Sequence, residues 1–396
     1  MPQRPPLRFP DGFLWGAATA AHQIEGNNVN NDWWAREHAA GTPVDEPSGD
    51  ACDSYHRYRE DIALLADVGL NTYRFSLEWS RIEPEPGFVS RANIDHYRRM
   101  VAACHESGLS PMVTLHHFTV PRWMAMQGGW RNPGAPDLFA RFTESALPIV
   151  ADGVEWVCTI NEPNMVALSA GAAGTALTAS ALPAPDTLIS EALVHAHRGS
   201  REVLGGIPAI KSGWTIATQA VEAEPGSEQV ARDYRYPRED FFLEAARGDD
   251  FVGVQAYTRT IIGADGPRPI PDGTETTLTG WEYFPPALSI GVRNAWTLTN
   301  GAPILVTENG IATTDDARRI AYTHAALTDL HEAITEGVDI RGYLHWSALD
   351  NYEWGSYKPT FGIIAVDRST FARTLKSSAR WLGDIAKANA IAGQVP

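Results

Sequence analysis

The chain has 396 residues, of which 44% are hydrophobic and 20% charged, a composition typical of a folded protein large enough for one α/β barrel or two to three ordinary domains. Its formal net charge of -16 disfavours nucleic acid and anionic membranes as partners, because their phosphate groups would repel it. Three widely spaced cysteines predict neither a disulfide framework nor a zinc site, and neither a secretory segment nor a membrane span is visible, so we expect a cytoplasmic protein.

Apolar runs typical of β-strands alternate with helical patterns along the chain. Strands are predicted at Phe13–Ala20, Thr72–Trp79, Ser110–His117, Trp156–Glu162, Ala209–Ala217, Phe251–Thr258, Ile304–Glu308 and Gly342–Ser347. Helices are predicted at Ser54–Val68, Ala92–Ser107, Pro136–Val150, Ser190–Leu204, Gln229–Ala246, Asp315–Glu336 and Arg373–Ala390. This alternation predicts an α/β fold in which a parallel sheet closes into a single (β/α)₈ TIM barrel. An open doubly wound sheet is the alternative, but Gly16–Thr19 does not match the glycine-rich phosphate turn of that fold.

No interdomain linker interrupts the pattern, so a single catalytic domain over residues 1–396 is expected. Two stretches rich in Pro and Gly, Gly171–Pro185 and Gly263–Gly280, follow strand ends and are interpreted as loops over the site. In a barrel of this kind the chemistry lies at the carboxyl ends of the strands.

Two glutamates stand at such strand ends, within Val157–Pro163 and Ile304–Gly310. Burying an unpaired charge is costly, so Glu162 and Glu308 suggest one site where two carboxylates converge. Paired carboxylates are what glycosidic bond cleavage requires. Two structural ion-pair residues are the alternative.

The other predicted strand ends carry amides, carboxylates, an imidazole, a phenol and indoles, which together are suited to binding a polyol. These side chains are Gln23, Glu25, Arg74, Glu78, His116, His117, Asn161, Tyr257, Trp346, Glu353 and Trp354.

Six motifs match one family in order and in position. They are Phe9–Ala20 followed by His22–Gly26, then Tyr73–Ile82, Thr114–Phe118, Thr159–Pro163, Val306–Gly310 and Trp346–Trp354. Through them the chain resembles the family 1 glycoside hydrolases, the retaining β-glucosidase and β-galactosidase type. The resemblance implies Glu162 as general acid/base, Glu308 as nucleophile, Trp346 as the floor under the sugar, and Tyr257 and Arg74 as contacts of the nucleophile. It also implies sugar hydroxyl contacts for Gln23, His116, Asn161, Glu353 and Trp354. It implies no cofactor and no metal.

The chemistry assigns the two glutamates opposite protonation states. A neutral acid must protonate the leaving oxygen while a carboxylate stands beneath the ring, so Glu162 needs a raised pKa and Glu308 an ordinary or lowered one. Burial and the Glu308 charge would raise the pKa of Glu162, and Arg74 and Tyr257 would favour the Glu308 anion. Retention of configuration would require the carboxyl groups to lie about 5–5.5 Å apart.

Neighbouring strand residues point to opposite faces, so His116 and His117 are not expected to share a metal. We assign His116 to the barrel interior and His117 to packing. Three tryptophans, Trp15, Trp79 and Trp156, are predicted to be core. Trp123 is left open between lining the site and bracing a loop, and Trp33 and Trp34 are placed at the entrance.

The chain departs from the family pattern at two places. Gln255-Ala256-Tyr257 replaces the usual Asn-Tyr-Tyr, and the small segment Gly171–Ala176 replaces an aromatic Gly-Tyr segment. These changes predict a more open, less aromatic leaving-group site that tolerates bulky aglycones. Glu353 predicts an unphosphorylated sugar because a carboxylate repels phosphate, although Lys358 lies nearby in the chain.

We therefore expect a retaining β-glycosidase, above all a β-glucosidase, acting on a small-molecule β-glycoside through a covalent glycosyl-enzyme intermediate. The alternatives are a transglycosidase, a β-glycosidase specialised for bulky natural-product aglycones, and a catalytically inactive sugar-binding protein.

Overall fold

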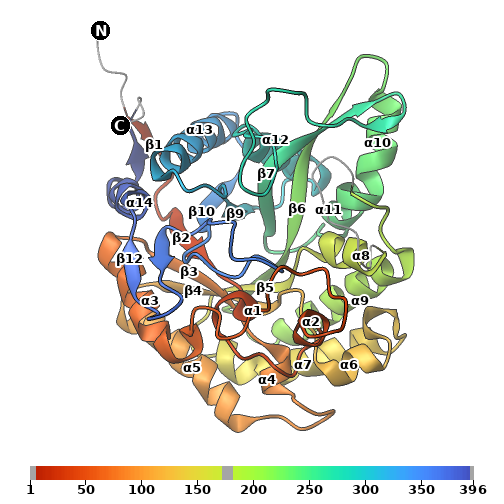
Figure 1. Ribbon diagram of the computed structural model, residues 1–396, viewed down its shortest axis with the longest axis vertical. Helices are drawn as coiled ribbons and strands as arrows, with labels where there is room; N and C mark the ends of the chain where they lie inside the picture. The colour runs from red at the N-terminus through yellow and green to blue at the C-terminus, as the bar shows by residue number, and fades with distance from the viewer. Residues whose placement is uncertain (1–5, 172–181, 393–396) are drawn as a thin grey trace.

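The computed structural model describes residues 6–171 and 182–392, and its centre is a closed barrel of parallel strands (Figure 1). Around the ring, β10 pairs with β2, and β7 pairs with both β6 and β9, so the described strands leave no open edge. The predicted (β/α)₈ TIM barrel is therefore confirmed. The eight barrel strands are β2 (Leu14–Ala18), β3 (Thr72–Ser76), β4 (Ser110–His116), β5 (Trp156–Asn161), β6 (Lys211–Ala223), β7 (Val252–Gly263), β9 (Ile304–Asn309) and β10 (Ile340–Trp346).

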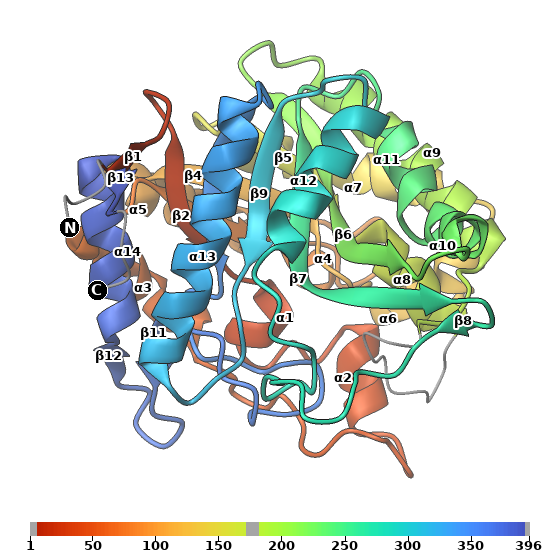
Figure 2. The same cartoon turned by 90° about the horizontal axis from the view of Figure 1, so that it is seen from above.

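Helices cover the outside of the barrel, and shorter elements lie in the loops and at the chain ends (Figures 1 and 2). The long helices are α3 (Ser54–Val68), α5 (Arg91–Glu106), α7 (Ala135–Val150), α9 (Thr187–Leu204), α12 (Ala287–Leu298), α13 (Asp316–Thr335) and α14 (Ser377–Ala388). The shorter ones are α1 (Ala21–Ile24), α2 (Asp32–Glu37), α4 (Trp79–Ile82), α6 (Arg122–Met126), a 3₁₀ turn (Gly129–Arg131), α8 (Pro163–Gly171), α10 (Glu228–Arg235), a π-helical turn (Tyr236–Asp240) and α11 (Phe241–Ala245). The remaining strands are β1 (Leu7–Arg8), β8 (Gly266–Pro267), β11 (Ile364–Val366), β12 (Arg373–Leu375) and β13 (Ala390–Ile391).

Three helical predictions need correction. Helix α12 was not predicted; it contains Gly291, a poor helix former, because a Cβ there would collide with Thr218 of β6. The predicted helix Gln229–Ala246 is broken by a π-helical turn containing a proline. The last helix begins at Ser377, since the four residues expected before it belong largely to strand β12.

The barrel interior is divided into an apolar half and a polar half. At the amino ends of the strands, apolar side chains from six strand regions pack together as a plug. They are Leu14, Met112, Trp156, Cys158, Phe251, Leu305 and Leu344. Above the plug, toward the carboxyl ends, Arg74 lies fully buried among polar side chains. Figure 2 shows α1, α2 and the loops gathered at the end toward which the arrow of β9 points.

Two irregularities in strand pairing aim site residues into this polar half. The β5–β6 pairing shifts register between Cys158 and Asn161, and the β7–β9 pairing shifts between Val254 and Gln255, opposite Glu308. A bulge adds one residue and changes which face the following side chains reach. Asn161 and Glu308 thereby enter the interior, where strict alternation from Cys158 and Leu305 would have turned them outward.

Candidate active site

Glu308, at the end of β9, is held by three donors. Arg74 Nη1 donates to its Oε1 at 2.6 Å and Gln255 Nε2 donates to the same oxygen at 2.7 Å, while Tyr257 donates through its hydroxyl to Oε2 at 2.6 Å. The predicted contacts of Arg74 and Tyr257 with Glu308 are confirmed. The Gln255 contact was not predicted. The set of donors fixes both oxygens of a carboxylate whose residue is only 4% exposed.

Glu162 directly follows β5 and is held by its backbone rather than by its carboxyl. Its φ of 45° lies in the left-handed region, which is costly for a residue with a Cβ and typical of functional sites. Its N–H donates to Thr215 O at 2.8 Å, and Pro163 then starts α8. Among the residues described, no side chain donates a hydrogen bond to its carboxyl.

The two carboxyls differ in how strongly the protonated form is favoured. Burial raises the pKa of Glu162 well above the ordinary value, and the charge of Glu308 raises it further. Burial also raises the pKa of Glu308, but there Arg74 and Tyr257 act in the opposite direction. The ordinary or lowered pKa predicted for Glu308 is therefore wrong, because desolvation outweighs its donors. The predicted order is retained, since Glu162 is raised further.

Asn161 lies beside the two glutamates, and three donors to its oxygen fix the orientation of its amide. Its Oδ1 accepts from Arg74 Nη2 at 2.5 Å, from Gln255 Nε2 at 2.9 Å and from Thr215 Oγ1 at 3.1 Å. Its Nδ2 lies 3.2 Å from His117 Nε2. The carbonyl oxygen is thus occupied by protein donors, and the NH₂ group lies on the His117 side.

The structure reverses the assignment of the two neighbouring histidines. His116 packs edge-on against Trp130 and Phe139, so it faces the helix layer and not the barrel interior, as had been predicted. His117 contacts Asn161 and stacks parallel to Trp346 at 5.9 Å. Thr114 of β4 accepts a hydrogen bond from Arg74 Nε at 3.0 Å inside the barrel, so strict alternation would turn His116 inward as well. The alternation is therefore broken at the last residue of the strand, His116.

Gln23, Trp346 and Glu353 form a second polar cluster. Gln23 Nε2 donates to Glu353 Oε2 at 3.1 Å, and Trp346 Nε1 donates to Glu353 Oε1 at 3.3 Å. Burial raises the pKa of Glu353 to about 8, despite these donors. Gln23 Oε1 is buried without a partner in the part of the chain described, which leaves an acceptor for an incoming hydroxyl.

Trp354 stands in a ladder of parallel rings. Its indole stacks on His22 at 5.7 Å and on His117 at 6.1 Å, with interplanar angles of 12° and 16°. Trp33 packs edge-on against it at 5.0 Å, which places that side chain at the mouth as predicted. Trp34 instead stacks on His38 at 4.5 Å.

The remaining tryptophans differ in burial and in contacts. Trp15, Trp79 and Trp156 are buried in the core, as predicted. Trp123, left open by the sequence, donates its indole N–H to Glu83 O at 2.9 Å and is buried, which favours a bracing role. Trp281 was missed: it is partly exposed and packs on Tyr257 at 5.5 Å. Its position directly after the predicted loop Gly263–Gly280 was the available signal.

Two predictions about the rim have different outcomes. Lys358 pairs with Asp45 at 2.9 Å, and 81% of its side chain is exposed, so it is engaged away from Glu353. Most of the segment Gly171–Ala176, and of the predicted loop Gly171–Pro185, lies outside the described residues.

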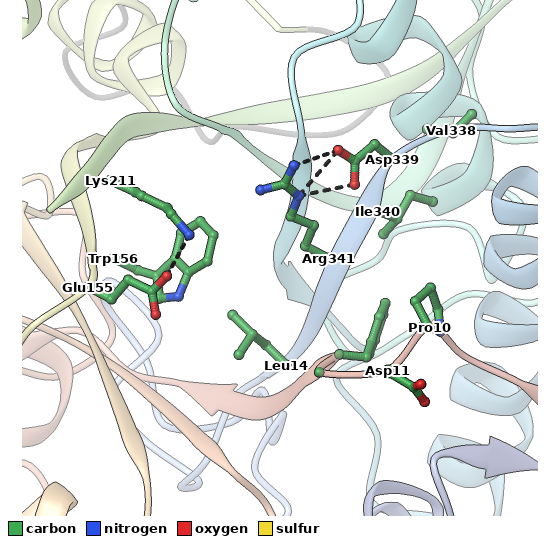
Figure 3. A pocket seen from close by; sticks show the side chains of 12 residues that line it. Pro10, Asp11, Leu14, Glu155, Trp156, Lys211, Val338, Asp339, Ile340 and Arg341 are labelled. Carbon is green, nitrogen blue, oxygen red and sulfur yellow. Dashed lines mark hydrogen bonds and ion pairs between the residues drawn. The ribbon is translucent and has the colours of Figure 1, made fainter. Parts of the chain in front are cut away.

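A hollow of about 430 Å³ lies at the opposite end of the barrel (Figure 3). Its wall carries two ion pairs, Lys211 with Glu155 at 2.6 Å and Arg341 with Asp339 at 2.8 Å. Trp156 of the apolar plug also lines it. Both pairs lie at the surface, and Asp11, the other charged residue of the lining, is exposed, so the hollow has volume without the convergent, buried polar groups of the site around Glu308.

Across residues 6–171 and 182–392, no group of three His, Cys, Asp or Glu side chains is arranged to hold a metal ion. None of the helices in these ranges has the length and apolarity needed to cross a membrane.

Comparison with known proteins gives concordant matches. The sequence model described as "Glycosyl hydrolase family 1" matches residues 6–184 and 252–391. "Beta-glucosidase A" of Thermotoga maritima is 31% identical, covering 97% of this chain and 99% of that protein, and "Thermostable beta-glucosidase B" of Thermobispora bispora is 33% identical, covering 97% and 92%. The crystal structure of the beta-glycosidase BGL167 superposes with a TM-score of 0.90 at 44% identity and covers 98% of this chain and 99% of that one.

Proposed function

Because this chain belongs to glycosyl hydrolase family 1, we propose that it hydrolyses β-glucosides with retention, using Glu308 as nucleophile and Glu162 as general acid/base. The protein is a glycoside hydrolase of the retaining β-glycosidase type, and its substrate is a small-molecule glycoside. The residue assignment rests on the unequal hydrogen bonding of the two carboxyls at one end of the barrel. Glu308 has three donors, whereas the described residues offer the Glu162 carboxyl none.

The first step joins the sugar to the enzyme. The Glu308 carboxylate attacks the anomeric carbon while Glu162 gives its proton to the glycosidic oxygen, the carbon–oxygen bond breaks, and a neutral alcohol leaves. Arg74 and Tyr257 keep the attacking carboxylate ionised and aimed. The raised pKa of Glu162 keeps its proton available at a pH where Glu308 has lost its own.

The second step releases the sugar. Ester formation removes the negative charge of Glu308, and with it one cause of the raised Glu162 pKa. Glu162 then accepts a proton from water, the hydroxide oxygen attacks the anomeric carbon, and Glu308 leaves as a carboxylate. Two inversions at the same carbon give net retention.

The sugar is proposed to lie on Trp346, with its hydroxyls bound by Gln23, Glu353 and Asn161. Gln23 Oε1 is a buried acceptor that no described residue occupies, and the Asn161 NH₂ lies on the side opposite the three donors to its oxygen. His117 replaces His116 in this set, because it contacts Asn161 and Trp346. Trp354, parallel to His117, is proposed as a wall. With a pKa of about 8, Glu353 both donates and accepts hydrogen bonds near neutral pH.

An unphosphorylated sugar is proposed, because Lys358, which lies near Glu353 in the chain, is paired with Asp45. On the leaving-group side, Trp281 supplies an aromatic surface beside Tyr257 that the sequence interpretation did not include. We keep the proposal of tolerance toward bulky aglycones, together with a single catalytic domain over residues 1–396 and a cytoplasmic location.

The test is a panel of nitrophenyl β-glycosides that differ only in the sugar, with the product anomer followed by NMR during the first minutes. Highest kcat/KM for the β-glucoside and initial release of β-glucose would support the proposal. Initial release of α-glucose, or no turnover of any β-glycoside, would contradict it. Comparing an aryl glucoside, cellobiose and a bulky natural-product glucoside tests the aglycone proposal, which a strong preference for cellobiose would contradict.

A further inference from the structure

Gln255 joins two groups that the proposed reaction needs. Its amide nitrogen donates to Asn161 Oδ1 at 2.9 Å and to Glu308 Oε1 at 2.7 Å. A side-chain amide has two N–H donors, so both are used. The side chain is fully buried. Gln255 lies on β7 at the register shift of the β7–β9 pairing, where its partner on β9 is Glu308.

Arg74 makes the same two contacts from the other side. Its Nη1 donates to Glu308 Oε1 at 2.6 Å and its Nη2 donates to Asn161 Oδ1 at 2.5 Å. The two acceptors and the two donors therefore form a closed ring, in which each acceptor is bonded to both donors. Such a ring fixes the separation between the nucleophile and the Asn161 amide more tightly than one bridge could.

The ring also determines which way the amides face. If Gln255 were turned over, its oxygen would face the oxygens of Asn161 and Glu308, which is repulsive. In the observed orientation the Gln255 Oε1 is buried with no partner in the described chain. The two bonds donated by the Gln255 NH₂ group therefore determine how its amide is oriented. Turning Asn161 over would in the same way set its NH₂ group against donors from Arg74, Gln255 and Thr215.

Both donors can act throughout the reaction. The bonds from Arg74 and from Gln255 to the Glu308 carboxylate are charge-assisted, and both weaken when the carboxylate becomes an ester. The carbonyl oxygen of the ester can still accept the N–H of Gln255. Gln255 can therefore hold the nucleophile in both charge states.

We propose that Gln255 is a positioning residue that locks Glu308 and Asn161 to each other, so that Asn161 presents its NH₂ group to the 2-hydroxyl of the sugar. This inference rests on the proposed function. It assigns a role to the residue that distinguishes this chain from the Asn-Tyr-Tyr pattern. An asparagine on this backbone is one methylene shorter, so we expect it to reach only one of the two acceptors.

The test compares a nitrophenyl β-glucoside with its 2-deoxy analogue, using the whole chain and the variants Gln255→Met and Gln255→Asn. Methionine keeps the length and approximate volume but donates no hydrogen bond. We expect Gln255→Met to lower kcat/KM for the glucoside about 10- to 100-fold, as for one or two lost bonds to a charged site. For the 2-deoxy substrate the loss should be smaller by about threefold or more, because only the lost bond to Glu308 acts there and the positioned 2-hydroxyl contact is missing. Gln255→Asn should fall between wild type and Gln255→Met.

Val254→Ala is the matched control, because Val254 precedes Gln255, is fully buried and points toward Gly291 of α12. It should lower Tm while leaving the ratio of the two kcat/KM values unchanged. Equal losses on both substrates in the Gln255 variants would overturn the inference while the proposed function stands. Failure of the wild-type protein to cleave the glucoside would overturn the proposed function and the inference together.

Discussion

The two ends of the barrel use charge in opposite ways. At the mouth, Arg74 and Glu308 form an ion pair whose side chains are 0% and 5% exposed, embedded in amide and hydroxyl donors. At the base, Arg341 and Asp339 form a pair whose side chains are 41% and 40% exposed (Figure 3). Exposed pairs contribute about 0–1 kcal/mol, whereas removing one partner of a buried pair costs about 3–5 kcal/mol.

The difference shows why the hollow at the base is not the site. Four of its charges form two surface ion pairs, Asp11 is exposed, and none of its lining residues has a buried side-chain donor or acceptor without a partner. The mouth carries a buried Gln23 oxygen that has no partner among the described residues, the Glu162 carboxyl, whose pKa is raised well above its ordinary value, and a strained Glu162 backbone. Backbone strain and shifted pKa values, which cost stability, are concentrated at functional sites. The volume of a hollow alone does not identify a site.

Replacing a carboxyl by an amide should give the largest difference in kcat between the two ends of the barrel. Glu308→Gln should lower kcat by on the order of 10⁴-fold or more, because the amide cannot form the ester. Asp339→Asn, the matched change at the base, should change kcat by less than about twofold. Steady-state assays on one aryl glucoside measure both, and comparable losses would contradict the contrast between the ends.

Replacement of Glu162 should depend on the leaving group. Glu162→Ala should lower kcat/KM by about 10²–10⁴-fold for an alkyl glucoside, whose leaving oxygen needs a proton. For a dinitrophenyl glucoside the first step should be nearly unaffected, because that leaving group needs no acid. Pre-steady-state bursts separate the two steps, and an equal loss in the first step for both substrates would exclude Glu162 as the acid.

Arginine replacement compares the two ion pairs directly. Arg74→Met leaves Glu308 buried without its cation and should lower the free energy of unfolding by about 3–5 kcal/mol. Arg341→Met should lower it by about 0–1 kcal/mol. Denaturant titrations monitored by tryptophan fluorescence measure both, and similar costs would show that burial does not distinguish the pairs.

The pH profile should move in a defined direction when one donor is lost. Activity requires ionised Glu308 and protonated Glu162, so it falls at low pH through the Glu308 pKa and at high pH through the Glu162 pKa. Tyr257→Phe removes a donor to the Glu308 anion and should shift the acid limb of kcat/KM upward by up to about one pH unit. The surface variant Tyr236→Phe should leave both limbs in place. A downward shift for Tyr257→Phe would be inconsistent with the assigned donor role.

Much of the fold followed from the sequence because barrel strands are continuous apolar runs separated by helical patterns. Helix α12 was not predicted. Its Gly291 is required by the close approach of Thr218 from another part of the chain, and a local sequence pattern does not show such a contact. The strand containing Gln255 was expected, but not its extension to Gly263, which depends on pairing with β6.

At the site, residue types were predictable and their directions were not. Alternation predicted that one of the two neighbouring histidines faces the interior, and His116 was assigned there. The alternation along β4 breaks after Thr114, and His117 faces the site instead. The direction of the Glu308 pKa shift was missed because it reflects complete burial, which the strand end alone does not reveal. Trp281 was missed because a contact with Tyr257 depends on how a loop folds back.

The most direct test of the central claim is to trap the covalent intermediate with 2-deoxy-2-fluoro-β-glucosyl fluoride and to locate the label by peptide mass spectrometry. The fluorine slows both steps, so the ester accumulates if the nucleophile is a carboxylate. One fluoroglucosyl group on Glu308, in wild type and in Glu162→Ala with this activated reagent, is the predicted result. A label on Glu162 or on any other residue, or continued inactivation of Glu308→Gln, would contradict the account.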